Sequence, residues 1–104
     1  MLTTIIALFV VNAVAHIISF QRLRKIKAPN ATGTLAFVFI NFMIAFLLWQ
    51  GLVWSKWLAL IFPVVGGLGL LVTTILKSKG TRIDYVILAL DIAIVELVLN
   101  HYFL

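Results

Sequence analysis

Apolar residues occur along this chain in four long runs that are separated by short polar segments. The first run covers residues 2–20 and contains no charged side chain. Two further runs, at about residues 34–52 and 57–76, are equally free of charge, whereas the last run, at about residues 83–104, contains acidic residues. Because a helix needs about 20 apolar residues to cross the hydrocarbon core of a bilayer, this pattern predicts four transmembrane helices.

The connections between the runs are short, and no repeat or low-complexity tract divides the chain. Short connections place consecutive helices side by side and antiparallel. No basic segment precedes the first run, so we interpret it as a retained span rather than a cleaved signal peptide. The predicted fold is therefore all-α: a single domain over residues 1–104 that forms an integral membrane four-helix bundle with up-down-up-down topology.

Composition supports this prediction, since 64% of the 104 residues are hydrophobic and only 11% are charged. The first connection holds four Lys or Arg residues between positions 22 and 27, the third holds three between positions 77 and 82, and the second holds only Lys56. Basic loops remain in the cytoplasm, so we expect both termini outside the plasma (cytoplasmic) membrane. The net charge of +5 then reflects topology and contacts with anionic lipid, and not nucleic-acid binding.

The last run carries Asp91 and Glu96 well inside its apolar stretch. An ionisable side chain at such depth costs about 2.5 kcal/mol or more on insertion, so each acid needs a partner or a functional role. Counting about 1.5 Å per residue from the centre of each run places Asp91, Asn12 and Asn41 within about 5 Å of the membrane midplane.

In the first run, Asn12, His16 and Ser19 are spaced by four and then three residues, so they share one helical face. Such a polar face should point into the bundle rather than at lipid. We therefore interpret Asp91, Asn12, Asn41 and His16 as a candidate proton- or solute-binding site. The alternative is that Asp91 is a neutral, protonated acid that serves only in helix packing.

Glu96 is about 140° around the last helix from Asp91, so the two acids cannot face the same neighbour. Together with Ala89, Ala93 and Asn100 it forms a second stripe, which is typical of a contact between helices. Small residues in the third run also favour close helix contact. The candidate helix-interface residues are Glu96, Asn100, Gly66 and Gly69, and a second copy of the chain is one partner that this interface could meet.

Several kinds of chemistry are disfavoured. The chain has no cysteine, which excludes disulfides and thiolate metal sites. His16 and His101 should lie at different depths, so they cannot be opposite ligands of one haem iron within a single chain. No hydrolase or phosphate-binding motif is present. We expect no enzyme activity, no cofactor and no metal.

The length and the number of spans resemble those of the small multidrug resistance transporters, which are dimers of four-helix chains. The glutamate that this family carries in its first span has no counterpart, since the corresponding region holds Asn12 and His16. The leading hypothesis is a small transporter or permeation protein, working as a homo-oligomer, that is linked to protons or cations through Asp91. The alternative is a non-catalytic accessory or assembly subunit of a larger membrane complex, with a regulatory membrane protein as a third option.

Overall fold

The computed structural model describes residues 2–27, 31–75 and 81–104, and all secondary structure in these ranges is helical. The four α-helices are α1 (Leu2–Lys25), α2 (Ala31–Trp49), α3 (Ser55–Leu70) and α4 (Arg82–Val98). Helices α3 and α4 each run on into a short π-helical segment, η1 (Leu71–Ile75) and η2 (Leu99–Phe103). The all-α prediction with four helices is therefore confirmed, and no strand occurs in these ranges.

The helix boundaries differ from the apolar runs mainly in α1. The helix continues past position 20 to Lys25, so that Arg22, Arg24 and Lys25 lie on its last turn rather than in a loop. Cations at this position interact favourably with the negative end of the helix dipole, which helps the helix to extend beyond its apolar part. Helix α2 begins and ends about three residues earlier than the second run, at Ala31 and Trp49.

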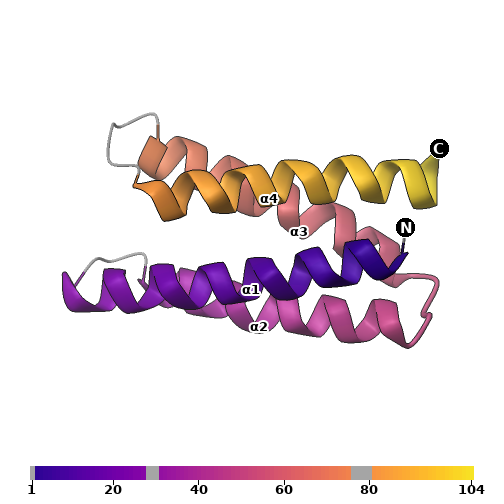
Figure 1. The fold of residues 1–104 in the computed structure, drawn as a ribbon, viewed down its shortest axis with the longest axis horizontal. Coiled ribbons are helices and arrows are strands. Elements are labelled where there is room, and N and C mark those ends of the chain that lie inside the picture. The colour runs from indigo at the N-terminus through magenta and orange to yellow at the C-terminus, as the bar shows by residue number, and fades with distance from the viewer. Residues whose placement is uncertain (1, 28–30, 76–80) are drawn as a thin grey trace.

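Consecutive helices alternate in direction (Figure 1), and α1 packs against α2 and α4 while α3 packs against α4 and α2. Both ends of the chain lie at the same end of the molecule as the connection between α2 and α3, and we call this the termini end (Figure 1). The other end, where α1 finishes with its three cations, is called the basic end.

One cluster of buried apolar side chains, which we call the hydrophobic core, lies in the half of the molecule nearer the termini end, and Leu23, Val38 and Ile87 are buried separately toward the basic end. Its members come from the first turns of α1 and α3 and from the last turns of α2 and α4, which all lie in that half (Figure 1). The core residues are Ile5, Phe9, Ile44, Ala45, Leu48, Ala59, Ile94 and Val98. Within this cluster the apolar side chains pack closely and leave little space. A cavity of about 300 Å³ lies beyond the cluster at the termini end, where its lining includes Leu48, Lys56 and Tyr102.

Large apolar side chains also cover the outside of all four helices. Examples are Ile18 on α1, Phe39 on α2, Leu68 on α3 and Ile92 on α4, each of which is at least half exposed. Helices α1 and α2, with 24 and 19 residues, are long and apolar enough to cross a membrane, and α3 is a shorter apolar helix. This finding on length and composition indicates membrane association only weakly.

Candidate functional site

Asp91 and Asn12 meet at the boundary of the hydrophobic core. The Asn12 side-chain amide donates a hydrogen bond of 2.8 Å to Oδ1 of Asp91, which joins α1 to α4. Asn12 is 0% exposed and Asp91 is 4% exposed. Each lies about one helical turn from a core residue, Phe9 in α1 and Ile94 in α4, on the side toward the basic end. The two polar side chains therefore lie at the edge of the apolar core.

Two of the three side-chain oxygen atoms in this pair have no hydrogen-bond partner among the described residues. Oδ2 of Asp91 and Oδ1 of Asn12 are buried and accept no hydrogen bond from the described residues. The ion pair found within these residues joins Arg22 to Asp84 and does not involve Asp91. Buried polar atoms are nearly always satisfied, so two neighbouring unpartnered acceptors indicate a place for a proton, a water molecule or a cation.

The backbone of α3 approaches Asp91 closely because α3 carries two glycines there. A Cβ atom added at Gly66 would lie 3.7 Å from Oδ2 of Asp91, and one added at Gly67 would lie 3.5 Å from the Asp91 Cβ. Gly69, by contrast, would place a Cβ atom with nothing within 4 Å. Gly66 is thus at a helix contact within the chain, whereas Gly69 faces open space.

His16 is connected to this pair through the backbone of Asn12. Its Nδ1 lies 2.8 Å from the Asn12 carbonyl oxygen one turn earlier, and donates to it in the tautomer that carries the proton on Nδ1. The imidazole ring stacks on Phe37 of α2, with ring centroids 5.7 Å apart. Asn12 therefore contacts Asp91 through its side chain and His16 through its main chain.

Asn41 is buried at a similar level but bonds elsewhere. It lies in α2 one turn before the core residue Ile44, and its side-chain amide donates to the Phe37 carbonyl oxygen at 2.8 Å. This bond lies within α2, so the structure joins Asp91 to Asn12 but shows no hydrogen bond from Asn41 to Asp91. The role predicted for Asn41 in binding stays a prediction.

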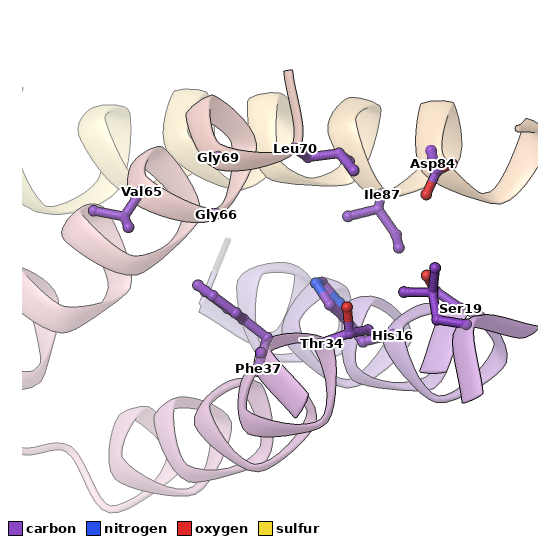
Figure 2. A pocket seen from close by; sticks show the side chains of 12 residues that line it. His16, Ser19, Thr34, Phe37, Val65, Gly66, Gly69, Leu70, Asp84 and Ile87 are labelled. Atoms are coloured by element: carbon purple, nitrogen blue, oxygen red, sulfur yellow. The ribbon is translucent and has the colours of Figure 1, made fainter. Parts of the chain in front are cut away.

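A cavity of about 260 Å³ lies in the half of the molecule that the core does not fill. All four helices contribute to it, and its polar lining includes His16, Ser19 and Asp84 (Figure 2). At its inner end the Phe37 ring extends toward Gly66, and a Cβ atom added at Gly66 would lie only 3.1 Å from that ring (Figure 2). Phe37 and Gly66 both line the cavity, and Gly66 also lies beside Oδ2 of Asp91.

An ion pair between α1 and α4 lies beside the cavity, and sequence reasoning missed it. Nη2 of Arg22 is 3.4 Å from Oδ2 of Asp84. The same oxygen accepts the Thr81 backbone N–H at 2.9 Å and the Thr81 hydroxyl at 3.0 Å, so Asp84 also caps the start of α4. Arg22 follows Ser19 by three residues on the polar face of α1, a signal that becomes visible once the helix is extended past position 20.

Glu96 and Asn100 lie on the outer surface of the molecule. Both are exposed, and the Asn100 side chain donates to the Glu96 carbonyl oxygen at 2.9 Å. They are therefore separate from the buried pair of Asp91 and Asn12, and their predicted contact with another chain stays a prediction.

No cluster of three or more His, Asp or Glu side chains suited to a metal ion occurs among residues 2–27, 31–75 and 81–104. Comparisons of the chain with known protein families, with curated proteins and with solved structures found no match. The function must therefore be argued from the site itself.

Proposed function

We propose that this chain is an integral membrane protein whose four helices all cross the bilayer. The distribution of side chains supports this proposal, because large apolar residues cover the outside while Asn12, Asp91 and Asp84 are buried between the helices. Polar groups in membrane proteins face the interior of the bundle in this way. With the basic end in the cytoplasm, both termini are outside the plasma membrane, and the cations of α1 lie where anionic lipid headgroups are found.

We propose further that the protein moves protons or a proton-coupled cation or small solute, and that Asp91 is the group that binds them. The observation that carries this proposal is the buried, unpartnered Oδ2 of Asp91 beside the unpartnered Oδ1 of Asn12. A proton on Oδ2 supplies the missing hydrogen-bond donor, whereas the ionised carboxylate requires a cation or water instead. Asp91 can then alternate between a protonated and a ligand-bound form.

The neighbouring residues fit supporting roles in this cycle. Asn12 holds one carboxylate oxygen of Asp91 in place through its amide. His16 lines the cavity and bonds to the backbone carbonyl of Asn12, and we propose that its ring exchanges protons between the cavity and Asp91. Asn41 is the least direct member, since its amide is occupied by α2.

Purified protein in liposomes tests this proposal. The vesicles contain a pH-sensitive dye, and a potassium gradient with valinomycin sets an inside-negative potential. We expect acidification of the lumen to be faster with the wild-type chain than with Asp91→Asn, whose amide cannot carry the proton. Equal rates for the wild-type chain, Asp91→Asn and protein-free vesicles would exclude proton movement through Asp91.

A second candidate function is an accessory or assembly subunit of a larger membrane complex. The exposed Glu96 favours it, because an acid on the outer surface of a transmembrane helix needs a polar partner from another chain. Purification in mild detergent distinguishes the two functions. A defined complex with other proteins would support the subunit, whereas a homo-oligomer that transports alone would support the transporter.

A further inference from the structure

The surroundings of Asp91 differ between its side toward the termini end and its side toward the basic end. Toward the termini end, the apolar core packs directly against the buried pair of Asp91 and Asn12. Toward the basic end, all four helices line the cavity of about 260 Å³, which is partly open because Val65 and Gly69 in its wall are exposed (Figure 2). Asp91 therefore has closely packed apolar side chains on one side and open volume on the other.

Most of the cavity lining is apolar, but its polar groups favour water as an occupant. Its wall carries the polar groups of His16, Ser19 and Asp84, and the neighbouring Arg22 has a buried Nε with no partner. A water molecule needs about 30 Å³ and two to four polar partners, so the volume and the lining suffice for several of them. A lipid acyl chain in the same space could not hydrogen-bond to the Ser19 hydroxyl or to the unpartnered Nε of Arg22.

We propose that this cavity is a water-filled vestibule through which Asp91 exchanges protons with the basic end alone, and that Phe37 is the barrier between the vestibule and the carboxylate. The inference rests on the proposed function of Asp91 and adds the side of access and the residue that controls it. The Phe37 ring stacks on His16 and lies against Gly66, whose backbone in turn lies beside Oδ2 of Asp91.

The chain contains no cysteine, so single cysteines can report where water reaches. Gly69→Cys places a thiol in the cavity wall, at a position where an added Cβ atom meets nothing within 4 Å. Leu68→Cys is the matched control, because Leu68 is exposed like Gly69 and lies at nearly the same depth on α3, but does not line the cavity. A membrane-impermeant, cationic methanethiosulfonate is the probe, and it reacts with thiolates, which form only in water.

We expect Gly69→Cys to react about tenfold faster than Leu68→Cys or more, because a thiol in lipid stays protonated. The side of access is read against two exposed reference positions, Lys25→Cys at the basic end and Val53→Cys at the termini end. Gly69→Cys should be labelled only when the reagent is added to the side of the membrane from which it also labels Lys25→Cys.

Equal reactivity of Gly69→Cys and Leu68→Cys would overturn the water-filled vestibule and favour a lipid-filled cavity. Labelling of Gly69→Cys from the side that labels Val53→Cys would overturn one-sided access. Gly33→Cys lines the cavity from α2, also with nothing within 4 Å of an added Cβ atom, and should repeat the result if Gly69→Cys does not fold.

Phe37→Ala tests the barrier. It should increase the Asp91-dependent proton flux several-fold, and the increase should disappear in Phe37→Ala/Asp91→Asn. An unchanged flux would overturn the role of Phe37 as the barrier. Labelling of Gly69→Cys does not depend on transport. If the expected labelling occurs without any proton flux, the proposed function is contradicted but the vestibule is supported. If proton flux occurs without labelling of Gly69→Cys, the vestibule is contradicted.

Discussion

The side-chain amide of Asn12 donates to Oδ1 of Asp91 across 79 positions of sequence, and this bond lies between the apolar core and the cavity lined by His16 and Asp84. It satisfies one oxygen of the carboxylate and leaves Oδ2 without a partner. The contact therefore has two consequences that can be measured separately. It should stabilise the packing of α1 against α4, and it leaves one carboxylate oxygen of Asp91 available for the proton binding that we propose.

The structural consequence is tested by apolar substitution of both partners. Asn12→Leu removes the only donor to Asp91 seen among the described residues, and we expect it to lower the free energy of unfolding by about 1–3 kcal/mol. Asn12→Leu/Asp91→Leu removes the stranded carboxylate as well, so the double variant should be more stable than the sum of the two single effects. Thermal unfolding is measured in one detergent for the wild type, Asn12→Leu, Asp91→Leu and the double variant. If the two single losses of stability simply add up to the loss of the double variant, the pair is not coupled.

Asp84 should matter more for stability than its ionic partner. Asp84→Ala deprives the Thr81 N–H, the Thr81 hydroxyl and Arg22 of one shared acceptor, and we expect a loss of about 1–2 kcal/mol. Arg22→Gln removes only the ion pair, and because Arg22 is 35% exposed its loss should be about 1 kcal/mol or less. Thermal unfolding of the two variants measures both losses of stability. A larger loss for Arg22→Gln than for Asp84→Ala would contradict the capping role of Asp84.

The two glycines of α3 should respond in opposite ways to alanine. Gly69→Ala meets no atoms within 4 Å and removes a flexible residue from a helix, so it should stabilise by about 0.5–1 kcal/mol. Gly66→Ala brings its methyl group to 3.1 Å from the Phe37 ring, and the resulting overpacking should cost about 1–3 kcal/mol. If both variants gain the same stability, α3 does not approach Phe37 and Asp91 as closely as described.

The proposed orientation predicts that both termini are outside the membrane. Both ends of the chain lie at the termini end, opposite the cations of α1 (Figure 1). Epitope tags fused at Met1 and at Leu104 should therefore both be digested by protease added to intact cells. Protection of both tags in intact cells and digestion in inverted vesicles would reverse the orientation.

Hydrophobic patterning was sufficient to predict four helices and no strands, because each apolar run is as long as a helix. Depth counting also indicated that Asn12 and Asp91 are near each other, since residues at the same level of neighbouring helices can meet. The patterning placed the end of the first span at position 20, because charges end an apolar run but do not end a helix. The pairing of Arg22 with Asp84 was missed for that reason.

Other parts of the site depend on packing that no sequence pattern expresses. Asn41 has the same depth as Asp91, but its amide bonds to the carbonyl of Phe37 in its own helix. Phe37 itself resembles any other apolar residue in its run, and only the structure places its ring between His16 and Gly66. The cavity is likewise lined by residues from all four helices, so it depends on tertiary packing.

Proton flux through the purified chain tests the central claim most directly, with Asp91→Asn and Glu96→Gln compared in the same liposome preparation. Both variants remove one carboxylate from α4, but Asp91 is buried beside Asn12 whereas Glu96 is exposed on the outer surface. We predict that Asp91→Asn reduces the flux to that of protein-free vesicles and that Glu96→Gln retains the wild-type rate. Full flux in Asp91→Asn would contradict the assignment of Asp91 as the proton-binding group.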